Sequence, residues 1–256
     1  MRAVRLHEHG LRVERLPMPA PAPGEALVRV HAAAITRDEL TWPTDRLPAI
    51  PSYELSGVVA ETGPGVVDLT SGDEVFALTP FDRDGVAADY ALVPASVLAA
   101  RPAALTHVQS AALPMPGLTA WQGLFDHGQL GEGERVRVLG QSGGVGHVAV
   151  QLARGQLASE GEPCELVFDT AGGEALAAAI GSAPRVVSVA EETEGANYFV
   201  VEPNREELVE LARRANTGEL RPEVDSVFEL EDALAAFARV SERGKHGKVV
   251  LRVAGE

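Results

Sequence analysis

Short apolar segments separated by turn residues make up the first 120 or so residues of the chain. Valine, alanine and leucine predominate in the segments, and Pro23-Gly24, Gly63-Pro64-Gly65 and Ser71-Gly72-Asp73 lie between them. Because glycine, proline and aspartate favour tight turns, the pattern predicts a small β-rich domain. Its strands are expected at Ala3–Leu6, Ala26–Ala33, Leu55–Glu61, Glu74–Leu78 and Tyr90–Val93.

From Glu134 onward the pattern changes to apolar strands that alternate with helical segments. Such alternation is typical of a parallel sheet flanked by helices. The helices are expected from Gly144 to about Ala158 and from Gly173 onward. The strands are expected at Val136–Leu139, Leu166–Asp169, Val186–Val189 and Tyr198–Val201.

The C-terminal part begins with a well-marked helix. Asn204 is a good cap, Glu207 follows three residues later, and Gly218 is a stop signal. A helix over Leu230–Ser241 and a strand over Lys248–Val253 are expected after it. We therefore predict a β-rich domain over residues 1–115, completed by 219–256, and a parallel-sheet domain over residues 116–218.

Composition and charge limit the partners. The chain has 256 residues, with 22 Lys and Arg against 37 Asp and Glu, and a formal net charge of −15. Such a chain repels phosphate backbones and anionic lipids, so we expect neither a nucleic-acid nor a membrane partner. The single cysteine, Cys164, excludes an internal disulfide framework, and no apolar run approaches the ~18 residues of a membrane span. We expect a cytoplasmic protein that acts on a small molecule.

A glycine-rich turn follows the first predicted strand of the parallel sheet. Glycine permits a tight turn and lets the backbone approach a pyrophosphate, whose charge free N–H groups then meet. The same kind of turn also occurs where a helix merely packs against a sheet. Its position between a strand and a helix favours dinucleotide binding, by Gly140, Gly143, Gly144, Val145 and Gly146.

With this turn in place, motifs along nearly the whole chain resemble the medium-chain dehydrogenase/reductase superfamily. The similarity is to its zinc-free quinone oxidoreductase branch, which includes zeta-crystallin. The resemblance implies a GroES-like lobe that holds the substrate, a Rossmann lobe that holds NADPH, hydride transfer in the cleft between them, and a homodimer. It also places Thr119 on the cofactor side. The matching motifs include Pro23-Gly24-Glu25, Ile50-Pro51, Gly72-Asp73, Gly117-Leu-Thr119-Ala-Trp121, Val167-Phe-Asp-Thr-Ala-Gly-Gly173 and Gly247-Lys248-Val-Val-Leu.

The zinc-dependent branch of the superfamily is a poorer match. That branch places a cysteine and a Gly-His-Glu motif where this chain has Thr36 and Ser52-Tyr53-Glu54. A zinc ion needs thiolate or imidazole ligands, which this sequence does not supply there. We therefore expect no metal.

The segment between the first two strands of the parallel sheet is too short for a complete Rossmann fold. Residues 140–164, 25 in number, separate Leu139 from the next strand. A βαβ unit takes about 30 residues or more, so one helix and a loop fit, but the second and third strands of the order 3-2-1-4-5-6 do not. We predict an α/β fold in which a GroES-like β-rich domain accompanies a truncated Rossmann-type sheet of four strands in the family order.

The two missing strands have consequences for the cofactor. The second strand normally carries the residue that reads the adenosine ribose or its 2′-phosphate, and no such residue can be assigned here. We therefore expect weakened NADPH binding. Val136–Leu139 becomes an exposed edge, which a dimer contact or a loop can cover.

Four polar residues are candidates for catalysis, and the resemblance places them on the substrate side. Tyr53 or Thr36 can donate a hydrogen bond to a carbonyl or quinone oxygen, and a partly buried Asp38 or Glu39 can act as a general base. A run of charged residues such as Arg37 to Glu39 is also typical of a solvated face.

Three functions are compatible with the sequence. The first is reduction of an activated C=C bond, quinone or carbonyl with NADPH, which the retained turn glycines favour. The second is a cofactor-independent, redox-neutral enzyme, such as a cyclase, isomerase or lyase, that uses the old substrate site; the missing adenosine half favours it. The third is a non-catalytic binding protein, since fold alone does not determine function.

Overall fold

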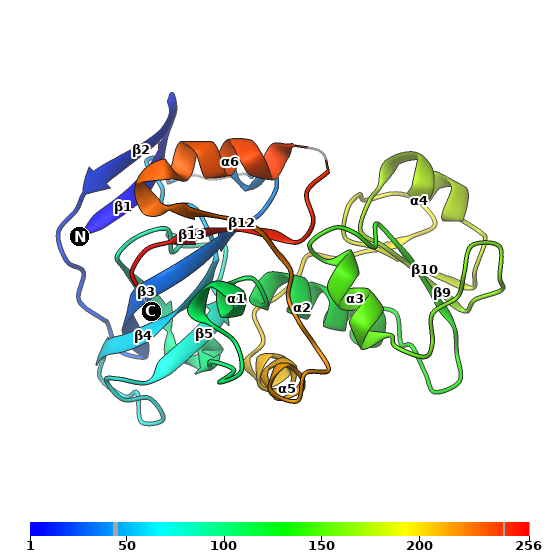
Figure 1. The fold of residues 1–256 in the computed structure, drawn as a ribbon, viewed down its shortest axis with the longest axis horizontal. Helices are drawn as coiled ribbons and strands as arrows, with labels where there is room; N and C mark the ends of the chain where they lie inside the picture. Colours follow the sequence, from blue (N-terminus) through cyan, green and yellow to red (C-terminus); the bar gives the residue numbers. More distant parts are fainter. Residues whose placement is uncertain (43–45, 243, 256) are drawn as a thin grey trace. The chain divides into compact units, whose positions relative to one another are not determined.

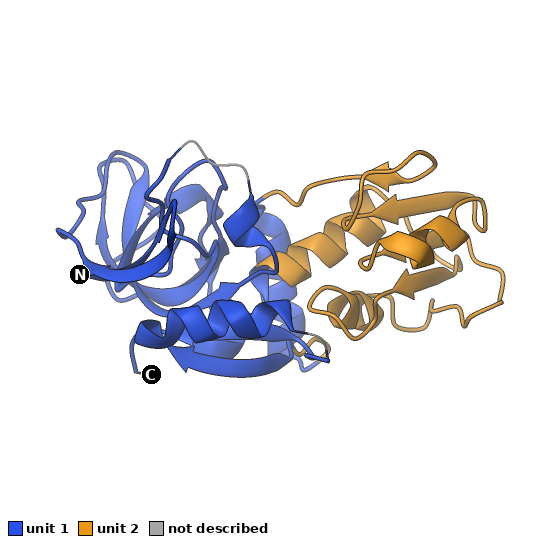
Figure 2. Cartoon of the chain, turned by 90° about the horizontal axis from the view of Figure 1, so that it is seen from above, with its two compact units in different colours: residues 1–114, 203–218, 222–256 blue, residues 115–202, 219–221 orange. Residues whose placement is uncertain are grey.

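The computed structural model describes residues 1–42, 46–242 and 244–255. They form two compact units, whose course is shown in Figure 1 and whose extent is coloured in Figure 2. Unit 1 comprises Met1–Pro114, Pro203–Gly218 and Pro222–Glu256, and unit 2 comprises Met115–Glu202 and Glu219–Arg221. Unit 1 thus takes its residues from both ends of the chain.

The strands of unit 1 form one sheet and a separate hairpin. Their bounds are β1 (Arg2–His7), β2 (Gly10–Arg15), β3 (Glu25–Ile35), β4 (Glu54–Thr62), β5 (Glu74–Leu78), β6 (Tyr90–Pro94), β7 (Ala99–Ala100), β12 (Val224–Glu229) and β13 (Lys248–Arg252). Within the described residues, a seven-stranded sheet has the order β12-β13-β3-β4-β5-β7, with β6 paired to β3. The long strand β3 is central, because β13, β4 and β6 all pair with it antiparallel.

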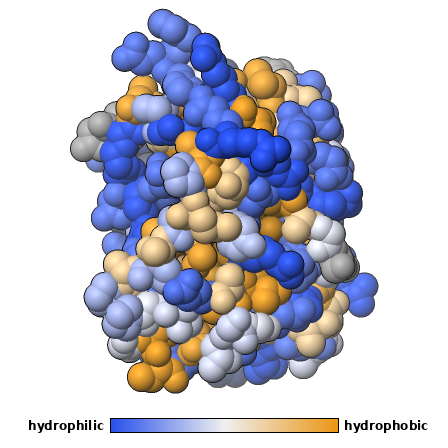
Figure 3. Space-filling model, turned by 90° about the vertical axis from the view of Figure 1, so that its left-hand side faces the viewer, coloured by the Kyte–Doolittle hydropathy of each residue, from blue (hydrophilic) through white to orange (hydrophobic). Residues whose placement is uncertain are grey.

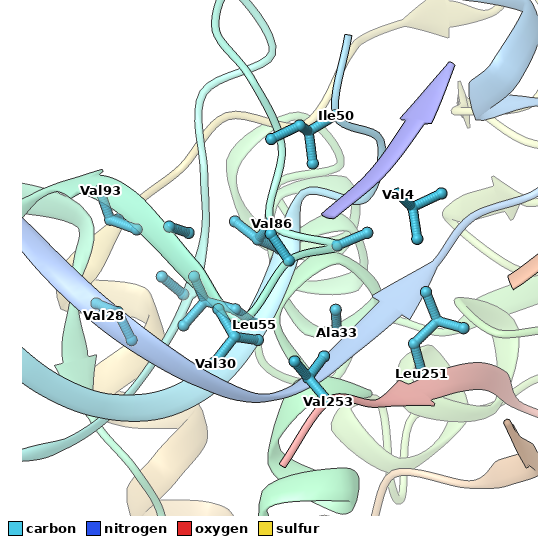
Figure 4. Packing of buried hydrophobic residues seen from close by; sticks show 14 of the residues in the cluster. Val4, Val28, Val30, Ala33, Ile50, Leu55, Val86, Val93, Leu251 and Val253 are labelled. Carbon is cyan, nitrogen blue, oxygen red and sulfur yellow. The ribbon is translucent and has the colours of Figure 1, made fainter. Parts of the chain in front are cut away.

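The larger hydrophobic cluster of unit 1 lies on one face of this sheet, and a smaller one on the other face includes Ala34, Val250 and Ala111 of the first helix. Val28 and Val30 of β3, Leu55 of β4, Val93 of β6 and Leu251 of β13 are completely buried members of the larger cluster (Figure 4). The predicted strands of this region are present. The hairpin strand β2 was not predicted, because its residues are mostly polar and none of them is fully buried.

Within the described residues, unit 1 contains the α-helices α1 (His107–Ala111), α5 (Arg205–Asn216) and α6 (Ala233–Ser241), together with short 3-10 helices at Glu39–Thr41, Ala95–Val97 and Leu230–Asp232. The predicted cap of α5 is confirmed, because the Asn204 side chain accepts hydrogen bonds from the backbone N–H groups of Glu206 and Glu207. The sequence pattern assigned α5 to the parallel-sheet domain, but the structure groups it with unit 1. Its buried stripe, which includes Leu208 and Leu211, packs beside β7.

Unit 2 contains a parallel sheet with helices. Its elements are α2 (Pro114–Trp121), a π-helical turn (Gln122–Asp126), β8 (Val136–Leu139), α3 (Gly146–Leu152), β9 (Leu166–Asp169), α4 (Gly173–Ala179), β10 (Arg185–Ser188) and β11 (Asn197–Tyr198). Within the described residues the sheet has four strands in the order β11-β10-β9-β8, and all neighbours are parallel. The prediction of four strands in the family order is confirmed.

The segment between β8 and β9 confirms the predicted loss of two strands. Among its residues, all of which the structure describes, it holds α3 and a single bridge between Leu157 and Val136, but no further strand. The helix ends at Leu152 rather than near Ala158 as expected, because the backbone turns at Gly155 with φ +88°.

Polar side chains predominate on the face of the molecule in Figure 3, with apolar ones scattered among them. Among the described residues, none of the helices combines the length and apolar composition needed to cross a bilayer.

Candidate functional site

The strand register of unit 1 brings three chain segments to one place. Ala34 lies opposite Glu54 in the antiparallel pair of β3 and β4, and Ile35 lies opposite Val249 in the pair of β3 and β13. Thr36, which directly follows Ile35, therefore comes between the start of β4 and the start of β13. The polar side chains at these strand ends meet one another.

A buried ion pair and a hydroxyl form the centre of this meeting point. The Lys248 ammonium pairs with the Glu54 carboxylate, and both side chains are buried. Lys248 Nζ also donates a hydrogen bond of 2.8 Å to Thr36 Oγ1, and Thr36 Oγ1 donates one of 3.3 Å to Glu54 Oε1. Thr36 is only partly buried, so this residue lies at the boundary between the buried ion pair and the surroundings.

A second buried carboxyl, that of Glu39, fastens the neighbouring backbone. Its two oxygens accept hydrogen bonds from the backbone N–H of Thr36 at 2.9 Å and of Ser52 at 3.0 Å. Burial raises the pKa of Glu39 to about 8, although the two amides and the Lys248 charge act in the opposite direction. Glu39 therefore holds the segment after β3 against the segment before β4. We call Thr36, Glu39, Ser52, Glu54 and Lys248 the polar cluster.

The backbone beside this cluster is strained at two non-glycine residues. Ser52 has φ 68° and Asp38 has φ 65°, in the left-handed region that disfavours side chains with a Cβ. The buried Ser52 hydroxyl donates a hydrogen bond of 2.8 Å to the Ala34 carbonyl, which holds the strained residue in place. Strain of this kind persists only where surrounding contacts enforce it, and it is concentrated at functional sites.

Aromatic side chains lie next to the polar cluster. The Tyr53 ring stacks on that of Trp42 with centroids 5.9 Å apart, and Phe81 meets both rings edge-on at 5.1 and 5.4 Å. Burial is the main cause that raises the pKa of the half-buried Tyr53, so the phenol stays protonated. The three rings form an apolar surface of the kind on which a planar ligand can stack.

The four candidate residues have different places in the structure. Thr36 and Glu39 belong to the polar cluster, and Tyr53 belongs to the aromatic group beside it. Asp38 is exposed, and it uses its backbone carbonyl to accept hydrogen bonds from the N–H and hydroxyl of Thr41.

Lys248 and its pairing with Glu54 were not foreseen as functional features. A sequence signal existed, because each is a charged residue at the first position of a mostly apolar strand. Only the register of β3, β4 and β13 reveals that the two charges face each other.

The glycine turn of unit 2, residues 140–146, is shaped by its glycines. Gly140 has φ +78°, and a Cβ on Gly146 would lie 2.1 Å from the Gly140 carbonyl oxygen. Among the hydrogen bonds of the described residues, none uses the N–H of Gly144 or Val145 as donor. The turn therefore offers amide groups to an anion at close range. Thr119 lies in α2 of the same unit and is 4% exposed.

Comparisons with known proteins identify the family of this chain. The alcohol dehydrogenase GroES-like domain model matches residues 22–103, and the zinc-binding dehydrogenase model matches residues 144–251. The quinone oxidoreductase of Coxiella burnetii has a similar structure, with a TM-score of 0.90, 25% identity and 99% coverage of both chains. The chain belongs to the medium-chain dehydrogenase/reductase superfamily, in its quinone-oxidoreductase-like branch.

Curated relatives agree with this family. A "Probable zinc-binding oxidoreductase, mitochondrial" of Arthroderma benhamiae is 29% identical, covering 92% of this chain and 91% of its own. Its alignment runs over 303 positions, more than the 256 residues of this chain, as an internal deletion requires. The "Chloroplast envelope quinone oxidoreductase homolog" of Arabidopsis thaliana is 32% identical over 57% of this chain, which spans 48% of that relative.

Zinc, which occurs in the names of some family members, does not fit this medium-chain dehydrogenase/reductase. Zinc sites are built from thiolates, imidazoles and carboxylates. At the family position this chain offers a hydroxyl and a phenol, and the carboxylate of Glu54 already faces the Lys248 ammonium. In the part of the chain that the structure describes, no three His, Cys, Asp or Glu side chains come together as a metal site.

Proposed function

We propose that this protein reduces a quinone, or a C=C bond conjugated to a carbonyl, with a reduced nicotinamide nucleotide. The Thr36 hydroxyl between buried Lys248 and Glu54 carries the proposal, because such a group can polarise a carbonyl oxygen. The aromatic group of Trp42, Tyr53 and Phe81 supports a planar substrate. Membership of the quinone-oxidoreductase-like branch supports the same reaction class.

The polar cluster acts on the substrate oxygen. A reduced nicotinamide, when bound, would supply a hydride, and the oxygen of an enone or quinone that accepted it would carry negative charge. Thr36 Oγ1 turns from Glu54 and donates its hydrogen bond to this oxygen, while Lys248 Nζ stays bonded to Thr36. The proton then passes from Thr36 to the oxygen, and Thr36 takes one from Lys248. Tautomerisation of the protonated product gives the hydroquinone or the saturated carbonyl compound, and Lys248 regains a proton from solvent through Thr36 once the product has left. Pre-positioned charge of this kind stabilises the transition state without reorganisation.

The glycine turn fits the phosphate next to the nicotinamide ribose of the nucleotide. Its backbone approaches closely at Gly140 and Gly146, and a Cβ on Gly143 would meet only the Gly140 oxygen, at 3.3 Å. The amide groups of Gly144 and Val145 are suited to phosphate oxygens.

Exchange of Thr36 tests the role of the hydroxyl. Thr36→Val removes it at nearly constant volume, and Thr36→Ser retains it. Steady-state reduction of 1,4-benzoquinone and 2-cyclohexenone is followed by the loss of NADPH absorbance. We expect Thr36→Val to lower kcat by about 10²–10³, as for the loss of one oxyanion donor, with little change in KM. Thr36→Ser should keep kcat within a few-fold. An unchanged kcat in Thr36→Val would contradict the assignment.

A charge change in the glycine turn tests the cofactor site. Gly143→Asp places a carboxylate beside the proposed phosphate site, and Ser182→Asp places the same charge at an exposed position elsewhere in unit 2. We expect Gly143→Asp to weaken NADPH binding on the order of tenfold or more, since 1.4 kcal/mol of repulsion suffices. Ser182→Asp should leave the affinity unchanged. Conversion of an enone without any nucleotide would instead establish a redox-neutral enzyme.

A further inference from the structure

The edge of β8 lacks the neighbour that reads adenosine. In a Rossmann sheet the second strand lies beside the first, and the residue at its carboxyl end binds the ribose hydroxyl or 2′-phosphate. Here β8 is the last strand of the sheet, next to β9 on one side only. The segment that follows α3 takes part of the vacant place.

The covering segment stays at the start of β8. Val136 N–H donates to the Gln156 carbonyl at 2.8 Å, and Ala158 N–H donates to the Val136 carbonyl at 2.9 Å. The glycine turn begins after Leu139, three residues further along a strand that rises ~3.3 Å per residue, so it lies about 10 Å away. The chain then turns toward β9 without returning to the carboxyl end of β8. No residue of this segment stands where a ribose reader would.

Two cations beside β8, Arg135 and Arg137, are held by the covering segment, and a third, Arg154, follows α3 at the end of that helix away from the glycine turn. Arg135 binds the Leu157 carbonyl and pairs with the Glu162 carboxylate at 3.0 Å. Arg137 donates to the Glu162 carbonyl at 2.7 Å. The loop itself is acidic, with Glu160 and Glu162. A 2′-phosphate that extended along this edge would meet carboxylates rather than a prepared cation.

We infer that this site recognises only the nicotinamide mononucleotide half of its cofactor. The protein therefore accepts reduced nicotinamide mononucleotide, NADH and NADPH with similar affinity. The inference rests on the proposed function, because it concerns the nucleotide that the glycine turn binds. A charge-assisted hydrogen bond contributes roughly tenfold to a hundredfold in affinity, so an intact ribose reader would separate the three nucleotides widely.

Direct binding distinguishes the possibilities. The fluorescence of the reduced nicotinamide is titrated with the full chain for each of the three nucleotides, at about 0.15 M salt, which screens the acidic surface beyond ~8 Å. We expect three Kd values within about threefold of one another, and no displacement by adenosine 2′,5′-bisphosphate. Gly143→Asp should weaken all three alike.

The other binding results distinguish failure of this inference from failure of the proposed function. NADPH or NADH binding more than tenfold tighter than the mononucleotide, or displacement by the adenosine bisphosphate, would overturn the inference while leaving the proposed reduction intact. Binding of none of the three would overturn the proposed cofactor function, and the inference with it. Glu162→Gln tests the acidic loop: it should leave the ratios of the three Kd values unchanged, and a selective gain in NADPH affinity would show that the loop does face the 2′-phosphate and would overturn the inference.

Discussion

The polar cluster of unit 1 and the glycine turn of unit 2 are built in opposite ways. The cluster draws its side chains from the ends of β3, β4 and β13, far apart in sequence, and buries their charges together. The turn is one continuous segment whose shape comes from its own glycines. A locally formed site can persist when neighbouring strands are lost, and the turn has remained beside a sheet of four strands. The cluster depends on every strand that contributes to it.

Removal of one charge from the cluster should have the largest effect. Lys248→Met leaves the Glu54 carboxylate buried without its cation, which costs about 3–5 kcal/mol in unfolding free energy. Urea unfolding followed by fluorescence measures it. The two tryptophans, Trp42 in unit 1 and Trp121 in unit 2, allow each unit to be observed separately in single-tryptophan variants. The loss should appear in the Trp42 signal.

An exposed ion pair of the same sheet provides the control. Arg252 pairs with Glu229 at 2.8 Å, with the two side chains 45% and 55% exposed. Arg252→Met should cost less than about 1 kcal/mol, as surface pairs do. The double variant Lys248→Met/Glu54→Leu removes both buried charges and should recover much of the loss. Equal costs for Lys248→Met and Arg252→Met would show that the buried pair is not a special feature.

Unit 1 should also be the acid-sensitive part. His107 is buried in contact with His31, with ring centroids 4.2 Å apart; Ser56 hydrogen-bonds it, and Glu74 and Arg101 face it. Burial above all lowers the pKa of His107 from 6.5 to about 4. Because the folded-state pKa is the lower one, stability is complete above pH 6.5 and is lost as the pH falls toward 4.

The loss of stability in acid can be calculated from the pKa shift of His107. At 1.36 kcal/mol per pH unit, about 3 kcal/mol is lost by pH 4 through His107. Unfolding free energies of wild type and His107→Phe between pH 7 and pH 4.5 test it, since phenylalanine keeps a ring against His31. The unfolding free energy of wild type should fall more steeply with decreasing pH than that of His107→Phe. Parallel pH profiles would exclude His107 as the cause.

The fold was predictable where local patterns determine it. Glu74–Leu78 is a strand with the predicted bounds, and the capped start of α5 at Asn204 was read correctly. The shortened sheet followed from the strand order of the resembled family and the length of the segment between Leu139 and Glu165, because its 25 residues cannot hold two more strands. The early end of α3 was missed although Gly155 marks it, since a single glycine within a helical pattern is compatible with continuation.

The candidate site was predictable only in part. Thr36 and Glu39 were identified through family resemblance, and the turn glycines through their position after a strand. That Lys248 meets Glu54 depends on strand register, which no local pattern specifies. The burial that raises the pKa of Glu39 is likewise a property of the assembled sheet.

A methyl group in the glycine turn should have a smaller, local effect. A Cβ on Gly146 would lie 2.1 Å from the Gly140 carbonyl oxygen, so Gly146→Ala forces the turn apart at a cost of about 1–3 kcal/mol. The Trp121 signal should report the loss and the Trp42 signal should not. Gly143→Ala is the control, because its nearest contact is 3.3 Å. Transmission of the Gly146→Ala effect to unit 1 would contradict the local character of the turn.

Backbone strain in the polar cluster should give the smallest change in unfolding free energy. Glycine should be more stable than alanine at Ser52 of unit 1, and less stable than alanine at Ser188 of unit 2. Ser52 is buried at φ 68° and Ser188, at the end of β10, is buried in an extended strand. Glycine and alanine both remove the hydroxyl at either position. At Ser52, glycine also removes the left-handed strain, so Ser52→Gly should be about 1 kcal/mol more stable than Ser52→Ala. At Ser188, glycine only loosens the strand, so Ser188→Gly should be about 0.5–1 kcal/mol less stable than Ser188→Ala. Urea unfolding measures the four variants. If the glycine variant is the less stable one at Ser52 as well, the cluster stores no strain.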